Sequence, residues 1–343
     1  MEYKTDTMIA PLPEIKHFSG MDEWKIRRKE LLDIIVDIEY GGMPPKPESV
    51  RIEQTQRGGK HPAAYRVHIN EKFTFMLTVY LPQLEEGKKY PVILTGDGCY
   101  RNCNDEVIDE ARERGYVVAK FNRTEFAHDM YNNDRVDGIY ALYPDSTFGA
   151  IAAWAWGYSR AMDCLETLDF VDAERVAITG HSRGGKTVLL AGAVDERFAV
   201  VNPNDSGCGG AGCYRYYTAA TAELEPSETL RDILGPVPYW FGPKLKAYID
   251  REAELPFDQH FLKAAVAPRK LLETNARSDT WANPVGSYVT YEEAKKVFDA
   301  LNIPDNIAYR IREGGHKHSI IDYRMLMAFI DDPTSTTPEY TYR

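Results

Sequence analysis

A serine between two glycines is the residue of this chain best placed for covalent chemistry. Gly180, Ser182 and Gly184 fit the pattern G-x-S-x-G within the run ITGHSRGGK. A serine in this pattern occupies a turn so tight that β-carbons at the flanking positions would clash, and its hydroxyl then projects above a sheet. The spacing predicts that Ser182 is a nucleophile that attacks acyl groups. The simpler alternative is a serine in a turn or at a helix start.

The flanking residues supply the strand and the helix that such a turn requires. Residues 176–178 form a short apolar run before the motif, and apolar residues follow it with helical spacing between 186 and 194. A five-residue match alone is weak evidence, but strand, turn and helix in this order are the setting of a nucleophile elbow. The context therefore favours the nucleophile.

A serine hydroxyl needs a histidine base and an acid that fixes the tautomer of that histidine. In α/β-hydrolases these groups follow in the order serine, acid, histidine, and the histidine comes after the last strand. His316 and His318 follow an apolar run that begins at Ile307, and they are the only two of the eight histidines at the required place. Position alone does not choose between them, and at least one is expected to be an ordinary loop histidine.

Two aspartates compete for the role of the acid. Asp279, in NARSDTW, follows the predicted strand that ends near residue 273, and Asp205, in NPNDSG, follows the strand before it. Either could reach a histidine above Ser182, and each could equally form a local turn or cap. A His-x-His pair can also bind zinc, but further ligands at metal spacing are missing from the sequence. We therefore expect no metal and no cofactor.

The elements that position these groups alternate regularly after residue 90. Apolar runs typical of buried parallel strands occur at 91–94, 116–121, 176–179, 198–201 and 270–273. Helical patterns occur at 106–113, 149–168, 183–194 and 291–301. This alternation predicts an α/β fold of the α/β-hydrolase type, with a mostly parallel central sheet between helices.

Two irregular segments are too long to be simple connectors. Residues 122–147 and residues 206–256 lack sustained periodicity, and we expect both at the carboxyl edge of the sheet, where the site of an α/β enzyme lies. The tyrosines of the first segment are candidates for a wall that stacks on a sugar or an alcohol: Tyr131, Tyr140 and Tyr143.

The chain before residue 49 has a different character. Asp22 is a candidate cap for a helix with an apolar face formed by Trp24, Leu31, Ile35 and Ile38, and we expect residues 1–48 to be an arm that packs on the core. Residues 49–343 would form the α/β-hydrolase domain. Its first part alternates with a period of two, which predicts antiparallel strands that open the sheet.

Composition limits the partners of the protein. The 343 residues are 43% hydrophobic and 27% charged, with a formal net charge of -11 and no run of five basic residues. Nucleic acid and anionic membranes are therefore poor partners, and a small-molecule or polysaccharide substrate is expected. The sequence leaves the oligomeric state open.

The amino terminus and the cysteines bear on location. Residues 1–14 lack the basic and apolar regions of a signal peptide, and no segment of about 18 apolar residues occurs. We expect a cytoplasmic protein, or a mature exported form whose signal has been removed. The five cysteines are few for this length and are expected to be reduced thiols: Cys99, Cys103, Cys164, Cys208 and Cys213.

The residues around the serine also carry a family resemblance. The run ITGHSRGGKTVLLAGAVDERFAVVNPNDSGCGGAGCYR resembles the nucleophile region of the glucuronoyl esterases, carbohydrate esterase family fifteen. That family has G-C-S-R-x-G-K followed by E-S-G-S-G-G-A-x-C-W-R. Three further runs match in order, so the resemblance covers nearly the whole chain: EYGGMPPKPE, FGAIAAWAWGYSRAMDCLE and LPFDQHFLKAAVAPRKLL.

The resemblance implies catalytic roles for single residues. It implies Ser182 as the nucleophile and His318, the second histidine of the pair, as the base. The family's acid falls on Asp205, and some bacterial relatives have an acid at the position of Asp279. Arg183 matches the arginine that helps to stabilise the oxyanion, which fits a charge placed where the tetrahedral intermediate develops one.

The resemblance also implies a sugar pocket. Lys186 matches a lysine that binds sugar hydroxyls, Trp281 matches a tryptophan that lines the uronate pocket, and Glu228 stands in place of a glutamine. A contact glutamate of the family, in G-E-N-x-W-F, is replaced here by Pro236, and Tyr239 or Glu228 is a candidate substitute. From the sequence pattern alone, Lys186 would be taken for a solvated lysine on a helix.

Other departures indicate a bacterial type of member. The fungal members have cysteines before the serine and after the base histidine, where this chain has His181 and Ser319. Cys213 matches another half-cystine, but its partner position holds Ser287. A chain that lacks both bridges does not depend on an oxidising compartment.

The expected function is that of a serine carboxylic-ester hydrolase that cleaves esters of glucuronic acid on xylan. An esterase for other carbohydrate esters, such as acetyl groups, would use the same machinery. A catalytically silent carbohydrate-binding relative would require a broken triad, and all candidate members are present.

Overall fold

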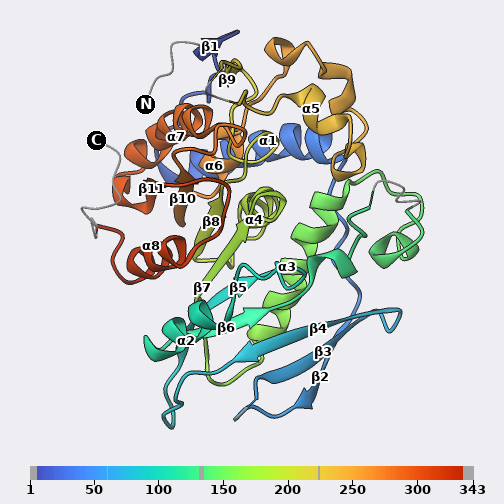
Figure 1. The fold of residues 1–343 in the computed structure, drawn as a ribbon. Helices are drawn as coiled ribbons and strands as arrows, with labels where there is room; N and C mark the ends of the chain where they lie inside the picture. Colours follow the sequence, from blue (N-terminus) through green and yellow to red (C-terminus); the bar gives the residue numbers. More distant parts are fainter. Residues whose placement is uncertain (1–5, 60, 131–134, 223–224, 335–343) are drawn as a thin grey trace.

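The central sheet determines the layers of the molecule (Figure 1). The computed structural model describes residues 6–59, 61–130, 135–222 and 225–334. Within these residues the sheet has nine strands in the order β11-β10-β8-β7-β5-β6-β4-β3-β2. A small second sheet pairs β1 (Asp6–Met8) with β9 (Tyr216–Thr218) in antiparallel fashion.

The large sheet is antiparallel at one end and parallel in the rest. The antiparallel strands are β2 (Val50–Gln56), β3 (Ala63–Ile69) and β4 (Phe73–Tyr80), and β4 pairs antiparallel with β6. The parallel strands are β5 (Tyr90–Thr95), β6 (Val117–Lys120), β7 (Val171–His181), β8 (Val200–Asn204), β10 (Lys270–Ala276) and β11 (Ile307–Arg312). The predicted antiparallel opening and parallel continuation are confirmed.

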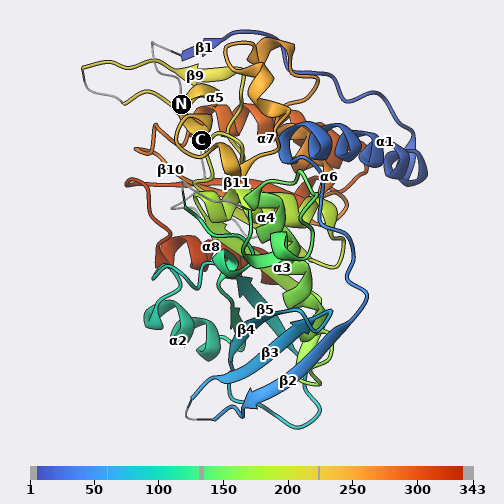
Figure 2. The same ribbon diagram turned by 90° about the vertical axis from the view of Figure 1, so that its right-hand side faces the viewer.

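Helices cover both faces of the sheet, and each face has its own apolar core. Val92 and Leu94 of β5 belong to the larger core, whereas Ile93 points to the smaller core on the other face. Figure 2 shows α2 (Asp105–Glu113) and α8 (Ile320–Asp331) on one side, opposite α1 (Gly20–Ile35) and α6 (His260–Ala265). Strand β5 is apolar throughout because both of its faces are buried. The predicted α/β-hydrolase class, a mostly parallel sheet between helices, is confirmed.

All four helices expected after residue 90 are present, some with shifted ends. The helix expected from residue 149 is α3 (Ala150–Leu165), and α4 (Arg183–Val194) follows the serine as predicted. The last expected helix begins earlier, as α7 (Pro284–Ala300), because the Asn283 side chain caps it by accepting from the N–H of Gly286. Helix α8 was not foreseen; Ser319 and Asp322 start it with a capping box.

Short helical turns and one five-residue helix occupy the irregular segments. They are η2 (Arg123–Glu125), η3 (Gly138–Ala141), α5 (Leu230–Leu234), η4 (Pro238–Trp240), η5 (Leu245–Tyr248) and η6 (Glu252–Glu254), and η7 (Pro304–Asn306) precedes β11. No helix among the described residues is long and apolar enough to cross a bilayer. All five cysteines are free thiols.

The amino-terminal segment packs against a distant part of the chain. Helix α1 begins at Gly20, so Asp22 lies in its first turn and is not its cap. The Trp24 indole donates to the carbonyl of Ala267 (3.2 Å) and the Arg28 guanidinium to that of Ala265 (2.7 Å). The segment therefore lies on the core as an arm; the boundary after residue 48 stays a prediction.

A buried glutamate ends this arm. Helix α1 continues as the π-helical turn η1 (Val36–Tyr40), and Glu39 within it accepts a hydrogen bond from the Gln259 amide (2.8 Å). Burial raises the pKa of Glu39 to about 7, although hydrogen bonds from neighbours including Tyr40 oppose the shift. The folded protein therefore holds this proton at a pH where the unfolded chain has released it.

We predict that Glu39 makes the protein less stable as the pH rises from 4.5 to 7. The folded state binds more protons in this range, so the free energy of unfolding falls, by on the order of 3 kcal/mol at about 1.4 kcal/mol per pKa unit. Urea unfolding of the parent and of Glu39→Gln from pH 4 to pH 8 measures the effect: the difference in unfolding free energy between them should be constant below pH 4.5, and the parent should lose stability relative to the variant above it. Glu48→Gln, at an exposed position of the same segment, is the control. Parallel pH profiles of the parent and Glu39→Gln would contradict the prediction.

Candidate active site

Four neighbouring parallel strands place the predicted catalytic groups at one edge of the sheet. Ser182 follows β7, Asp205 follows β8, Asp279 lies three residues beyond β10, and both histidines lie beyond β11. These strands are adjacent in the sheet order β11-β10-β8-β7. The carboxyl ends of parallel strands meet at the same edge, so residues far apart in the sequence converge there.

Ser182 occupies the strained turn that its motif predicts. Its backbone has φ 57° and ψ -121°, a conformation that L-residues rarely adopt. A β-carbon on Gly180 would collide with the carbonyl of Gly184, so glycine is required where the strand meets the helix. The first N–H groups of α4 have no acceptor within the helix and surround the serine, which favours negative charge beside it.

A buried ion pair supports this turn from below. The Asp97 carboxylate, just after β5, accepts the backbone N–H of His181 (2.9 Å) and pairs with the buried guanidinium of Arg123. The same carboxylate leaves no room for a β-carbon on Gly184. Asp97 therefore fixes both sides of the serine turn. Asp97 was not predicted from the sequence, because a lone aspartate after a strand carries no distinguishing pattern.

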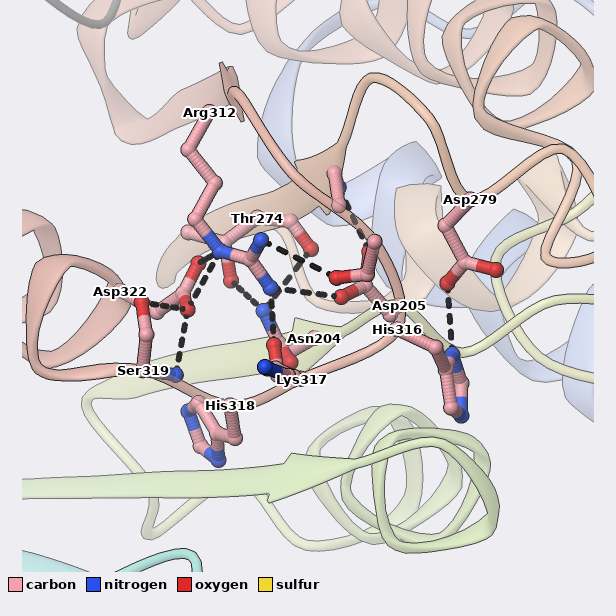
Figure 3. Close-up of polar contacts among 12 residues, drawn as sticks. Asn204, Asp205, Thr274, Asp279, Arg312, His316, Lys317, His318, Ser319 and Asp322 are labelled. Atoms are coloured by element: carbon pink, nitrogen blue, oxygen red, sulfur yellow. Dashed lines mark hydrogen bonds and ion pairs between the residues drawn. The ribbon is translucent and has the colours of Figure 1, made fainter.

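The structure brings together His316 and Asp279. The Nδ1 atom of His316 lies 2.6 Å from Oδ2 of the buried Asp279, and the imidazole side chain is 43% exposed (Figure 3). A proton on Nδ1 that faces a carboxylate leaves Nε2 as the acceptor, which is the tautomer a general base needs. The ring of His316 lies against that of His181, the residue before the serine, with centroids 4.4 Å apart.

His318 has different surroundings. Its ring is buried, stacks on Tyr323 at 4.2 Å between centroids, and places Nε2 3.5 Å from the hydroxyl of Thr179. Burial, followed by the neighbouring His181, lowers the pKa of His318 to about 3, so it stays neutral. Among the described residues neither Asp205 nor Asp279 bonds to it, and Figure 3 shows it apart from both. The expected pairing of His318 with an aspartate is therefore absent.

Asp205 is close to this pair but is engaged elsewhere. One oxygen accepts the N–H of Ala276 (2.6 Å), and the other lies 3.1 Å from the guanidinium of Arg312. Burial, together with the charge of Asp279, raises the pKa of Asp205. The two aspartates thus have different partners: Asp279 faces an imidazole, and Asp205 faces a guanidinium.

Ligand atoms of Asp205, Asp279 and His316 lie within 4.8 Å of one another. Such a cluster could in principle hold a cation. Arg312 already places a positive charge against Asp205, and His316 takes up Asp279. Side chains of the protein thus already occupy an oxygen of each aspartate in this cluster.

The three residues predicted for the sugar pocket also converge. The Lys186 ammonium lies 3.7 Å from the carboxylate of Glu228, whose backbone N–H donates to the carbonyl of Trp281 (2.9 Å). Burial raises the pKa of Glu228, and Lys186 and the Trp281 side chain oppose this shift. The Trp281 side chain is 40% exposed and forms an open apolar surface beside the carboxylate.

Lys186 is less available than its predicted role requires. It is buried, and its ammonium donates to the carbonyls of Ser206 (2.5 Å) and Cys208 (2.6 Å). With Glu228 as a third neighbour, the three donors of the ammonium group are directed at protein atoms. Lys186 therefore holds the loop after Asp205 and fixes Glu228, which the pattern of a helix lysine could not reveal.

Arg183 is held in place by the long loop after β6. Its guanidinium lies 2.8 Å from Asp129 and over the ring of Trp240 at 4.6 Å. The other oxygen of Asp129 accepts from the Tyr239 hydroxyl (2.9 Å) and from the Trp240 indole (2.8 Å). Both long segments were expected at this edge of the sheet, but the sequence did not single out Asp129 or Trp240.

The predicted tyrosine wall is wrong for Tyr140, which is buried in the larger core and stacks on Phe148 at 5.3 Å. Tyr143 is half-buried, packs edge-on against Trp156 at 6.4 Å and lines a surface pocket with Met43 and Phe148. Tyr131 lies outside the described residues.

The fold, the serine turn and the carboxylate–imidazole pair define an α/β-hydrolase. The family model "Glucuronyl esterase, fungi" matches residues 67–302. The chain is 30% identical, over 86% of its length, to a 4-O-methyl-glucuronoyl methylesterase from Podospora anserina. The chain therefore belongs to the glucuronoyl esterase family, as the resemblance indicated.

Solved structures agree with this assignment. A carbohydrate esterase family 15 glucuronoyl esterase from Caldicellulosiruptor kristjansonii is 32% identical, with a TM-score of 0.82 over 98% of this chain and 94% of that one. A mutant glucuronoyl esterase from Sporotrichum thermophile, solved with methyl 4-O-methyl-β-D-glucopyranuronate, is 25% identical, with a TM-score of 0.77 over 96% of this chain and 89% of that one. The chain spans 55% to 62% of the length of three curated relatives, including the Podospora protein.

We predict that Gly184→Ala distorts the serine turn. The new methyl group would meet the carboxylate of Asp97, which cannot move without losing Arg123 and the N–H of His181. Overpacking of this kind lowers the free energy of unfolding by about 1–3 kcal/mol. Thermal unfolding and ester hydrolysis should both show the defect. Gly235→Ala, whose nearest atom lies 3.3 Å away, is the control, and equal behaviour of the two variants would contradict the prediction.

Proposed function

We propose that this protein is a serine carboxylic-ester hydrolase that cleaves esters of glucuronic acid residues on xylan. The observation that carries the proposal is the His316–Asp279 pair beside the strained Ser182 turn, on the fold of the glucuronoyl esterases. Membership of the family and the uronate ester bound by the Sporotrichum enzyme support the substrate class.

Ser182, His316 and Asp279 form the proposed triad. Ser182 Oγ attacks the ester carbonyl carbon while Nε2 of His316 takes its proton, and Asp279 stabilises the imidazolium. The same proton then passes to the leaving alcohol, and an acyl-enzyme remains. Water, deprotonated by His316, attacks the acyl carbon and releases the uronic acid and the serine. Arg183 and the N–H groups at the start of α4 stabilise the oxyanion in both steps.

The proposed base is His316 and not His318. The contact with Asp279 gives His316 the correct tautomer and charge support, and its exposure lets it reach a substrate. His318 is neutral, buried and stacked on Tyr323, which suits a residue that packs beneath the site. The sequence resemblance had favoured His318, whereas position alone had left both histidines open.

We predict opposite behaviour for the two histidines. Ser182→Ala and His316→Gln should each lower kcat by roughly 10³-fold or more, because triad members act as a unit. His318→Gln should keep kcat within about tenfold of the parent. Hydrolysis of p-nitrophenyl acetate, with circular dichroism to verify folding, measures both effects. An inactive but folded His318→Gln beside an active His316→Gln would restore His318 as the base.

The surface formed by Glu228 and Trp281 suits the sugar of a uronate ester. Trp281 offers an open face for stacking, and Glu228 offers a charged acceptor for a sugar hydroxyl in place of the glutamate that Pro236 replaces. Tyr239, the other candidate substitute, bonds to Asp129. Lys186 serves this pocket indirectly, because it holds Glu228 and the backbone of residues 206–208.

We predict a split between substrates when this pocket is changed. Glu228→Ala and Trp281→Ala should raise KM for benzyl glucuronate about tenfold, since a hydrogen bond with a charged group contributes roughly 1.5–3 kcal/mol. Neither change should alter KM for p-nitrophenyl acetate by more than about twofold. Lys186→Met should lower activity on both esters, and Lys295→Met on α7 is its control. Equal losses on both esters in the Glu228 and Trp281 variants would contradict the sugar role.

One panel of esters tests the proposed substrate. The intact protein should hydrolyse benzyl glucuronate and methyl glucuronate faster than methyl galacturonate, because the 4-hydroxyl of galacturonate points the other way. Activity on p-nitrophenyl acetate alone would support a serine esterase but contradict the uronate substrate. Other carbohydrate esters, such as acetyl groups, would then be favoured.

A further inference from the structure

A single guanidinium lies at the centre of the loop that carries both histidines. Arg312 is the last residue of β11, its side chain is buried, and Figure 3 shows its guanidinium among Asp205, Lys317 and Asp322. It donates to the carbonyls of Glu313 (3.3 Å) and Gly315 (3.2 Å) from one nitrogen and to that of Lys317 from another. Three alternate carbonyls of an irregular loop thus point at one side chain.

Two carboxylates from other elements hold this guanidinium. The Nε atom lies 2.9 Å and 2.8 Å from the two oxygens of Asp322 in α8, and a terminal nitrogen lies 3.1 Å from Asp205 after β8. Both carboxylates are fully buried. Breaking such a buried pair by removing one partner is strongly unfavourable, so the guanidinium has little freedom to move.

The loop between these contacts has no regular structure of its own. It begins at Arg312 and ends at Ser319, where Asp322 accepts from both the backbone N–H (2.7 Å) and the hydroxyl (2.8 Å) of Ser319. His316 lies between the bonded carbonyls of Gly315 and Lys317. Its backbone position is therefore set on both sides by Arg312.

We infer that Arg312 is a positioning residue that fixes the histidine loop, so that His316 meets Asp279 and Ser182, and that Asp205 acts through Arg312 and not as an acid of the triad. This inference rests on the proposed esterase function. The planar fork of an arginine bonds several acceptors in fixed directions, whereas the point charge of a lysine does not. Asp205 holds the fork from the sheet side and Asp322 from the helix side.

The same strand provides a matched control. Arg310 lies two residues before Arg312, so its side chain leaves the same face of the sheet, and it too is buried. Its guanidinium lies 5.8 Å from the ring of Phe329 in α8. A change at Arg310 therefore disturbs the packing of β11 on α8 but not the carbonyls of the histidine loop.

The first experiment compares Arg312→Gln and Arg312→Lys with Arg310→Gln and Arg310→Lys. We expect Arg312→Gln to lower kcat about 100-fold on both benzyl glucuronate and p-nitrophenyl acetate, with KM within about threefold of the parent. Arg312→Lys should recover less than half of the loss on a logarithmic scale. The Arg310 variants should keep kcat within about threefold of the parent, even if their unfolding temperatures fall as much as those of the Arg312 variants. A folded Arg312→Gln with near-parental kcat, or an equal loss in Arg310→Gln, would overturn the inference.

The second experiment tests whether Asp205 acts through Arg312. Asp205→Asn should lower kcat in the parent but have little further effect in Arg312→Gln, because the group it supports is gone. Independent, multiplying losses in the double variant would instead give Asp205 its own role at the imidazole and refute the second half of the inference. If Arg312→Gln does not fold, the same cycle between Asp205→Asn and Asp322→Asn tests the shared partner.

The two esters separate this inference from the proposed substrate. Hydrolysis of p-nitrophenyl acetate needs the serine, the base and the loop but not the sugar pocket. If the intact protein cleaves p-nitrophenyl acetate but no uronate ester, the proposed substrate is wrong. The Arg312 and Arg310 variants would still test the positioning role of Arg312 on p-nitrophenyl acetate. A protein whose Ser182→Ala variant hydrolyses p-nitrophenyl acetate as fast as the parent would overturn both.

Discussion

The positive φ of Ser182 is the constraint on which the site depends. A residue in this conformation costs about 1–3 kcal/mol and persists only where its surroundings leave no alternative. Here β7 and helix α4, which is buried from Gly184 to Ala193, fix the ends of the turn, and Asp97 fixes its middle through the N–H of His181. The strain is thus stabilised by the core of the molecule, and the hydroxyl is held outward before any substrate arrives.

Charge around this turn is almost entirely buried and paired. Asp97 faces Arg123, Asp205 and Asp322 face Arg312, and the pairs have little exposure. Each pair costs desolvation, which further hydrogen bonds offset only if the geometry is fixed. His316 differs from these groups, since it combines a buried carboxylate partner with an exposed ring. That combination is what the proposed base requires, and it distinguishes His316 from the buried groups that hold the framework.

The sequence predicted the frame of the molecule better than the details of its site. The strand, turn and helix around Ser182 follow from local patterns, because glycine requirements and apolar periodicity are properties of neighbouring residues. The different surroundings of His316 and His318 do not, because they depend on a loop whose carbonyls accept hydrogen bonds from Arg312. Asp129, Asp97 and Arg312 went unnoticed for a similar reason: a single charged residue acquires meaning only when a distant element supplies its partner.

Lys186 is a residue whose position, but not whose contacts, could be predicted from the sequence. It lies close to Glu228, as the family pattern indicated, but its ammonium bonds to two backbone carbonyls that a sequence pattern does not predict. Position was predictable from the sequence, whereas the distribution of its hydrogen bonds was not. A residue can therefore be in the expected place and do a different task.

The packing of the amino-terminal arm has a consequence for how the chain is made. Trp24 and Arg28 find their acceptors at Ala267 and Ala265, and β1 finds its partner strand about residue 217. During synthesis from the amino terminus, helix α1 therefore emerges long before the surface that covers its apolar side exists. Until α6 has left the ribosome, Trp24, Leu31 and Ile35 remain exposed to water and to other chains. The segment that holds α1 is therefore made well before the residues that bury it.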